Sequence, residues 1–396
     1  MTRCLCAVVF LMAAAAAAGA PIQLDPDALS ARYRNWTYYP DWIIPPICLN
    51  PFTCATNTSQ STVDVVQVFQ LPDEVSAGVW RAVYLQFDGT GYETYMATST
   101  DMLHFNLSEP TLVPGQPGCI FSPRDGRPPT WDTKPVKGDF DFGGITFIGP
   151  VLDNYTVGAR SVLKRNAAGL FYYAYGAYPS FGYESAPGAD GIASSEDGLH
   201  FVRAVPTPII DTLAQHGAQP WEAGQVYAPF LIPHPDGRLM DIYNAGAADG
   251  HEQSGAAYLA GGIDALPGYD FDTNTSLWQR DAGNPLLTTD ASATYQASDP
   301  KVWWDAEQNV WILIYFCNGA GTGGGANICI AFSDDQRTWA KASTPLYKHG
   351  GHPKGYDADH AHKVWLTSDG AGTLYLYYTG VFASGRGILL LTSKPL

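Results

Sequence analysis

The chain has 396 residues, of which 46% are hydrophobic and 13% aromatic, and it contains 41 glycines and 29 prolines. The apolar content is enough for a large core, and so much glycine and proline with many aromatic residues favours short strands and turns over helices. The formal net charge of −16 argues against nucleic acid and anionic membranes as partners, because both bind basic surfaces. The charge suits a protein that acts on neutral molecules outside the cell.

Residues 1–20 have the pattern of a secretory signal peptide. Arg3 supplies the positive charge, residues 7–18 form a short apolar segment, and residues 18–20 read Ala-Gly-Ala, a cleavage pattern. An uncleaved membrane anchor is the alternative, but the segment is shorter than the roughly 20 apolar residues that a spanning helix needs. We therefore expect a secreted monomer, extracellular or associated with the cell wall.

Cysteine use agrees with secretion. Five of the seven cysteines follow the signal peptide. Cys48 and Cys54 flank a short loop, while Cys317 and Cys329 end one expected strand and begin the next, so each pair can form a disulfide and Cys119 is left over. Asn-x-Ser/Thr sequons, some of which we expect to be unused, fit a glycosylated surface; they begin at Asn35, Asn57, Asn106, Asn154 and Asn274.

A repeated phrase organises the rest of the chain. Residues 192–204 read as a strand ending in Ala-Ser-Ser, a tight turn with Asp-Gly, and an aromatic residue that begins the next strand. Altered copies occupy residues 96–106 and 330–340. Self-similar units of this kind indicate a repeat architecture.

Short predicted strands group into five such units. They are residues 63–71, 79–87, 92–99 and 105–112; 142–152, 169–178, 191–195 and 201–210; 225–232, 238–246, 256–262 and 277–287; 300–304, 310–317, 328–333 and 338–346; and 362–366, 373–378 and 387–392. The pattern predicts an all-β, five-bladed β-propeller with four antiparallel strands per blade over residues 63–396. A two-sheet sandwich is the alternative.

The fifth unit lacks a fourth strand, which would leave an unpaired edge. We expect the N-terminal strap, residues 21–62, to pair with the last blade through residues 35–44 and to close the ring. Residues 114–137 interrupt the repeat and carry Arg124, Arg127 and Trp131. We expect them to form a long crossing loop between the first two blades, and long loops are often functional.

Acidic residues stand where the first strand of each unit begins. Because these strands line the central channel of a propeller, their carboxyl groups should converge on one site; they are Asp64, Asp141, Glu222, Asp299, and Asp357 with Asp359. Close carboxyl groups shift one another's pKa values apart, and glycosidic bond cleavage needs one protonated and one ionised carboxyl. Glu222 is the best acid, because Glu does not favour turns, whereas turn chemistry explains Asp299 equally well.

The chain resembles the five-bladed glycoside hydrolases of the family 43 type, which are related to families 32, 62, 68, 117 and 130. The phrases that carry the resemblance are short. They are Phe-Asp-Gly-Thr-Gly-Tyr at residues 87–92, Tyr-Gly-Ala-Tyr-Pro at 175–179 with Gly-Tyr-Glu at 182–184, Glu-x-Gly-x-Val at 222–226, and His-Lys-Val at 362–364 with Gly-Arg-Gly-Ile at 385–388.

This resemblance implies roles for particular residues. It makes Asp64 the base, Asp141 the residue that tunes and orients, and Glu222 the acid. Asp64 departs from the usual Asp-Pro context, which Asp299 has, so Asp41 and Asp299 stay open as the base. His360 or His362 would hold a water or a calcium-bound water in the channel, and no other cofactor is implied.

Further residues are candidates for binding the substrate. His360 and His362 lie on one face of a strand, and a hydrogen-bonding pair explains them better than a metal site. Aromatic residues near the channel mouths can stack on sugar rings. The substrate-binding candidates are Asp41, Trp131, Tyr178, Trp221, His360 and His362.

The sequence thus predicts a secreted glycosidase that cleaves a furanosidic or pentose-containing oligo- or polysaccharide, by an inverting mechanism. Inversion requires acid and base carboxyls roughly 6.5–9.5 Å apart, and retention about 5 Å. The alternatives are a carbohydrate-binding propeller without activity, or a phosphorylase or transglycosylase in which Arg124, Arg127 and Arg160 help to hold phosphate. A sialidase is disfavoured, because no trio of channel arginines stands out.

Overall fold

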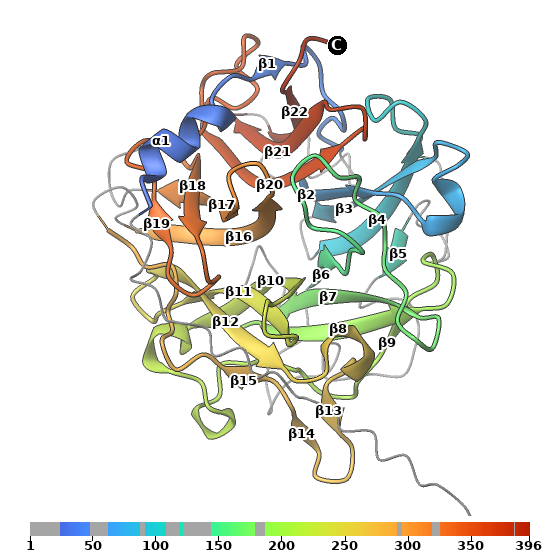
Figure 1. Ribbon diagram of the computed structural model, residues 1–396, viewed down its shortest axis with the longest axis vertical. Coiled ribbons are helices and arrows are strands. Elements are labelled where there is room, and N and C mark those ends of the chain that lie inside the picture. Colours follow the sequence, from blue (N-terminus) through green and yellow to red (C-terminus); the bar gives the residue numbers. More distant parts are fainter. Residues whose placement is uncertain are drawn as a thin grey trace, which may run out of the picture.

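The computed structural model describes residues 24–47, 62–87, 92–107, 119–121, 144–178, 187–290, 295–318, 325–383 and 385–396. Strands dominate this part of the chain, and its one α-helix is the short α1 (Pro26–Ser30). No helix among these residues is long and apolar enough to span a membrane. The strands form sheets arranged around a centre (Figure 1).

Five blades of four strands make up the fold, which confirms the predicted five-bladed propeller. Blade 1 contains β2 (Thr62–Phe69), β3 (Trp80–Phe87), β4 (Tyr92–Ser99) and β5 (Cys119–Phe121). Blade 2 contains β6 (Gly144–Pro150), β7 (Phe171–Tyr178), β8 (Ala189–Ser195) and β9 (Val202–Arg203). Blade 3 contains β10 (Gln225–Pro233), β11 (Leu239–Gly246), β12 (Glu252–Leu259) and β15 (Gln279–Arg280). Blade 4 contains β16 (Gln296–Asp305), β17 (Val310–Asn318), β18 (Asn327–Ser333) and β19 (Ala340–Lys341). Blade 5 contains β20 (His360–Ser368), β21 (Leu374–Phe382), β22 (Gly385–Thr392) and, from the N-terminal strap, β1 (Thr37–Tyr38).

The strap pairs with the last blade as expected. Thr37 and Tyr38 pair antiparallel with Thr392 and Leu391 of β22, and Ile44 forms a further bridge to Ile388. The strap thus supplies the fourth strand that blade 5 lacks, at the outer edge of the sheet (Figure 1). Closure of the ring by this strap is not seen among the described residues.

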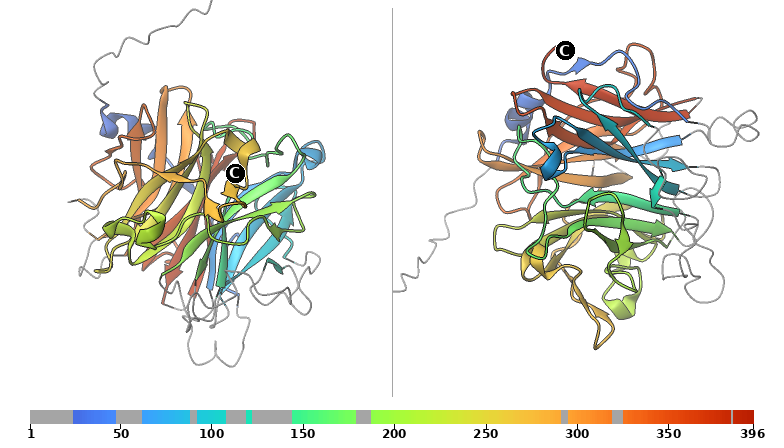
Figure 2. Two further views of the ribbon diagram at one scale, coloured as in Figure 1. Left: turned by 90° about the horizontal axis from the view of Figure 1, so that it is seen from below. Right: turned by 90° about the vertical axis from the view of Figure 1, so that its right-hand side faces the viewer.

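Two predicted outer strands differ in extent from the strands of the structure. In blade 1 the three described residues of the expected strand at 105–112, residues 105–107, form one bridge, between Asn106 and Thr98, and β5, from the predicted crossing loop, also pairs with β4. In blade 3 the expected strand at 277–287 shortens to β15, because a turn at Asp281 interrupts it: Asn284 N donates to Asp281 O at 3.2 Å. The hairpin of β13 (Tyr269–Asp270) and β14 (Thr275–Ser276) projects from the rest of the molecule (Figure 2).

The repeated phrase forms the same turn in three blades. In each copy a serine hydroxyl donates to an aspartate at 2.9–3.0 Å, and that aspartate accepts backbone N–H groups from the residues two and three positions on. The aspartates are Asp101, Asp197 and Asp335. Both carboxylate and hydroxyl are occupied by the turn itself, so the repeat is structural.

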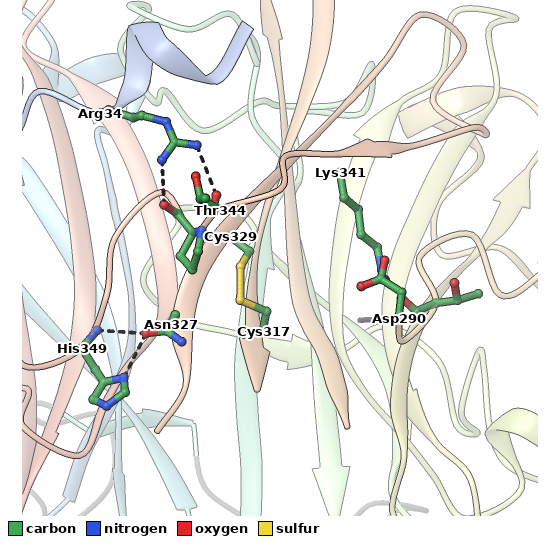
Figure 3. Close-up of a disulfide and its surroundings, with 10 residues drawn as sticks. Arg34, Asp290, Cys317, Asn327, Cys329, Lys341, Thr344 and His349 are labelled. Carbon is green, nitrogen blue, oxygen red and sulfur yellow. Dashed lines mark hydrogen bonds and ion pairs between the residues drawn. A yellow bond between two sulfur atoms is a disulfide. The ribbon is translucent and has the colours of Figure 1, made fainter. Parts of the chain in front are cut away.

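Cys317 and Cys329 form the predicted disulfide across β17 and β18 (Figure 3). Cys48 and Cys54, and the side chain of Cys119, lie outside the described residues. The sequon asparagines in the described part are exposed; they are Asn35, Asn106, Asn154 and Asn274.

Candidate functional site

A bulge at the same place in each inner strand fixes which channel positions correspond. The pairing register shifts once in β2, β6, β10, β16 and β20, and in each case a residue with positive φ lies at the shift. Four of the residues are not glycine, although this backbone conformation is unfavourable for side chains with a Cβ; they are Val65, Ala228, Asp299 and Lys363. Bulges of this kind redirect side chains near active sites.

This register separates residues that the sequence had aligned. His362 occupies the position equivalent to Asp64, whereas the equivalents in blades 3 and 4 are Tyr227 and Ser298. Asp299 is itself the bulge residue, and Glu222 precedes the strand altogether, in the 3-10 turn η5 (Pro220–Glu222). The prediction that the acidic residues occupy equivalent channel positions is therefore wrong for Asp64, Glu222 and Asp299.

A cavity of about 160 Å³ opens where the inner strands of blades 3, 4 and 5 begin. Its polar lining includes Glu252 of β12, Gln296 of β16 and Arg386 of β22. Residues of two parallel β-bridges between blades line the cavity. One bridge joins Glu252 to Gln296, and the other joins Thr62 to Arg386, which also lines the cavity. The cavity thus lies at one mouth of the channel, where neighbouring blades join.

Asp64 lies directly behind this cavity and is completely buried. Its Oδ2 accepts from Lys363 Nζ at 2.8 Å and from Arg386 Nη1 at 3.1 Å, and both cations line the cavity. Burial alone would raise the pKa of the Asp64 carboxyl, but Lys363 and Arg386 outweigh it and hold that pKa well below its usual range. Asp64 is therefore an ionised carboxylate that anchors two cations at the mouth.

The two predicted histidines also line the cavity, with ring centroids 5.9 Å apart. His360 Nδ1 accepts from Ala326 N at 2.8 Å, so the proton of a neutral ring lies on Nε2. Burial lowers the pKa of His360, and it lowers that of His362 far more, despite the nearby Asp64. His362 Nε2 is buried and has no hydrogen-bond partner among the described residues.

A water molecule fits His362 better than calcium does. The nearest carboxylate, Asp64, is already bound to Lys363 and Arg386, whereas calcium binds several oxygen ligands. Within the described part of the chain, no group of three or more His, Cys, Asp or Glu side chains is arranged to hold a metal ion. A water held by the unpartnered Nε2 remains the prediction here.

Glu222, the predicted acid, lies elsewhere and is completely buried. Its Oε1 accepts from Gln219 N and forms an ion pair with Arg280 Nε, both at 2.7 Å, and its Oε2 accepts from Tyr243 Oη at 2.8 Å. Gln219 N and Tyr243 Oη donate hydrogen bonds to the carboxyl group, and the Arg280 guanidinium pairs with it as a cation. The hydrogen bond from Gln219 N to Glu222 belongs to the capping box of η5, so this contact is structural.

Two further buried carboxyl groups, Asp190 and Asp241, were not predicted from the sequence. Asp190 interacts electrostatically with both Asp241 and Glu222. Asp190 of β8 has no hydrogen-bond partner on either oxygen among the described residues, and Asp241 of β11 has none on Oδ2. Burial raises the pKa of Asp241 to about 7, and burial together with Asp241 raises that of Asp190 well above its ordinary value. These two carboxyls, on blades 2 and 3, therefore favour the protonated form more than an exposed aspartate does, and neither lines the mouth cavity.

The remaining predicted residues divide as follows. Asp299 is buried and pairs with buried Lys301 at 2.9 Å, while Asp41 is exposed and pairs with Lys354. Tyr178 is buried beside Tyr227, with ring centroids 6.3 Å apart, so it lies next to the cavity wall. Trp221 stacks on Tyr243 in the Glu222 cluster.

Asp141 and Trp131 lie outside the described residues, as do Arg124 and Arg127. Asp357, expected at the channel, is buried and accepts from Tyr347 Oη and Tyr378 Oη, which makes it structural.

Sequence reasoning missed Glu252, Lys363 and Arg386, three charged residues of the cavity. Lys363 and Arg386 lie in two of the phrases that carry the family resemblance, His-Lys-Val and Gly-Arg-Gly-Ile, but neither was named as a site residue. Glu252 and Arg386 begin the third strands of their blades, and only the parallel bridges between blades bring them to the mouth.

Comparison with known proteins yields solved structures alone; no family model and no curated protein matches the sequence. One structure described as a glycoside hydrolase matches with a TM-score of 0.70 at 22% identity, over 94% of this chain and 97% of the other. A second, a complex of BT0996 with RGII, matches with a TM-score of 0.69 at 23% identity, over the same shares. A thermostable family-43 glycoside hydrolase matches with a TM-score of 0.50 at 13% identity, over 87% of this chain and 91% of the other. The chain therefore has the five-bladed propeller fold of these glycoside hydrolases.

Proposed function

We propose that the chain is a secreted glycoside hydrolase that cleaves a furanosidic or pentose-containing glycan at the mouth cavity. The observation that carries the proposal is the cavity itself, which combines Glu252 with the Asp64–Lys363–Arg386 ion cluster on a fold shared with glycoside hydrolases. The complex of BT0996 with RGII supports a carbohydrate as the substrate. The acidic net charge suits a neutral glycan.

Glu252 is the carboxyl that lines the cavity within the described part of the chain, and we assign it a catalytic role there. Its Oε2 accepts from Asn244 Nδ2 at 3.3 Å, which orients the carboxyl without neutralising it. The second carboxyl of the pair is Asp64 or the predicted Asp141. Asp64 does not itself line the cavity, and in this arrangement its carboxylate positions the two cations that do.

A panel of arabinan, arabinoxylan and the RGII polysaccharide, assayed by released reducing sugar, tests the activity. We expect one of them to be cleaved by the wild-type protein, and Glu252→Gln to abolish turnover while the protein stays folded. Glu196→Gln, at an exposed position of the repeat turn, is the matched control. The hydrolase proposal fails if no glycan is cleaved, and the assignment of Glu252 fails if its variant retains activity.

A phosphorylase is the second candidate, because Lys363 and Arg386 both line the cavity and bind anions. Inorganic phosphate added to the same assay distinguishes the two reactions. A phosphorylase releases sugar phosphate only when phosphate is present, whereas a hydrolase releases reducing sugar equally without it.

A further inference from the structure

A second cavity, of about 470 Å³, lies at the opposite end of the inner strands. Strand β16 begins at Gln296, in the wall of the mouth cavity, and reaches Trp304, in the wall of the second cavity. About eight residues of strand separate the two side chains, or roughly 26 Å. The two cavities are therefore distinct hollows on opposite faces of the propeller.

Two tryptophans form one wall of this cavity. Trp304 and Trp311 stand directly opposite each other in the β16–β17 pair, with ring centroids 5.1 Å apart and planes inclined at 56°. The backbone of Trp304 is fixed on its other side, since its N–H donates to Tyr155 O and its C=O accepts from Val157 N, both at 2.8 Å. The half-buried indoles thus form a preformed apolar surface.

Polar side chains surround this apolar surface. Asp153, Asn154 and Asp334 line the same cavity, and all three are exposed. Asp334 belongs to the third copy of the repeat turn, but the hydrogen bonds of that turn go to Asp335. The Asp334 carboxylate is thus not committed to the turn.

An aromatic wall of two angled indoles beside carboxylate acceptors suits a sugar ring, which has an apolar C–H face and a rim of hydroxyl donors. The volume lies within the range of about 300–1,000 Å³ typical of ligand pockets. Two carboxylates, on a chain with a net charge of −16, disfavour anionic sugars.

We propose that this cavity is a second glycan-binding site, which holds a neutral segment of the polysaccharide away from the bond that is cleaved. The proposal rests on the proposed function for its choice of ligand, and it assigns no chemistry to the site. The rival occupant is a glycan attached to Asn154, which begins the sequon Asn-Tyr-Thr and whose Oδ1 accepts from Thr156 N at 2.8 Å.

Affinity electrophoresis in gels containing wheat arabinoxylan or sugar-beet arabinan tests the site. The protein is made without N-glycosylation and carries Glu252→Gln, so that it does not degrade the gel. We expect Trp304→Ala to weaken retention roughly tenfold, equivalent to about 1.4 kcal/mol. Asp334→Asn should weaken it about threefold, as loss of one hydrogen bond would. Phe271→Ala, which removes an aromatic side chain that is 61% exposed outside the cavity, should change nothing.

The outcomes separate the two proposals. In the otherwise wild-type protein, Trp304→Ala should leave release of 4-nitrophenol from 4-nitrophenyl α-L-arabinofuranoside unchanged. Three outcomes would overturn the second site. They are no retention of the unglycosylated protein, unchanged retention in both cavity variants, and retention that Phe271→Ala weakens as much as the cavity variants do. Retention that depends on Trp304, in a protein that cleaves no glycan, overturns the hydrolase proposal alone. Asp334→Asn keeps the test decisive if Trp304→Ala does not fold.

Discussion

Asp64 and Asp190 are both completely buried aspartates on strands of the propeller, yet their carboxyl groups are in opposite protonation states. Asp64 contacts Lys363 and Arg386, and its pKa lies well below the ordinary value. The Asp190 carboxyl has no hydrogen-bond partner among the described residues and interacts with a second buried aspartate, Asp241, and its pKa lies well above the ordinary value.

The difference shows that neighbouring charges, and not burial, decide which buried carboxyl is ionised. A carboxyl with a lowered pKa stabilises the fold at pH values above about 4, and that contribution is lost as the pH falls. A carboxyl with a raised pKa stabilises the fold only while it keeps its proton, so its contribution is lost as the pH rises. The two sites therefore respond to pH in opposite directions.

Removal of Lys363 should have the largest effect, because it makes the surroundings of Asp64 more like those of Asp190. Lys363→Met leaves a buried charge short of one partner, and we expect the free energy of unfolding to fall by about 3–5 kcal/mol at pH 7. Chemical denaturation measures the loss. Lys363→Met combined with Asp64→Asn should recover part of it, and an unchanged stability in the single variant would contradict the role of the ion cluster.

Substitution of Glu222 should lower the free energy of unfolding but leave turnover largely intact. Glu222→Gln keeps the shape but weakens the contacts with Arg280 and Tyr243, and we expect a loss of about 1–3 kcal/mol in the free energy of unfolding. Activity measured well below the melting temperature should persist. Complete loss of turnover in a variant that is fully folded would instead support the prediction that Glu222 is the acid.

The pair of protonated carboxyls should make stability decline as the pH rises. The pKa of Asp241 is about 4 in the unfolded chain and about 7 in the folded protein. Between these pH values, Asp241 should lower the free energy of unfolding by about 1.4 kcal/mol for each unit by which the pH rises. Melting temperatures recorded from pH 4 to pH 8 measure this slope. Asp241→Asn cannot ionise and should reduce the slope, leaving the part that Asp190 contributes, whereas Asp236→Asn, at an exposed position, should not change it.

The exposed ion pair between Asp41 and Lys354 should give the smallest effect. Solvent screens exposed charges, so Asp41→Asn should leave the unfolding free energy and the activity within experimental error. A clear loss of activity would mean that Asp41 acts in the site, which was one of the alternatives for the base.

The repeats made much of the fold predictable from sequence. The repeated phrase that contains Asp101, Asp197 or Asp335 encodes its own turn through local hydrogen bonds, so the structure of the turn does not depend on distant residues. The spacing of Cys317 and Cys329 likewise indicated a hairpin disulfide. The position of β5 was not predictable, because a strand of three residues has too few positions for a periodic pattern.

The candidate site was only partly predictable. Asp64, His360 and His362 were found, because they stand at the start of inner strands. The burial of Glu222 depends on Arg280, which lies on a later strand of the same blade, and no local pattern reports that contact. The bulges also shift the register of each inner strand by one residue relative to simple alternation, so strand alternation alone does not show that Asp299 and Asp64 occupy different positions.

The pairing of β1 with β22 also has a consequence for the order of folding. Thr37 emerges early during synthesis, but its partner Thr392 is added more than 350 residues later. At about 5–20 residues per second, the strap waits for tens of seconds with its strand edge unpaired. Contacts of such long sequence separation form slowly and leave edges open to association with other chains. Strap and last blade should therefore be the last part of the propeller to assemble and the part most in need of protection while the chain is made.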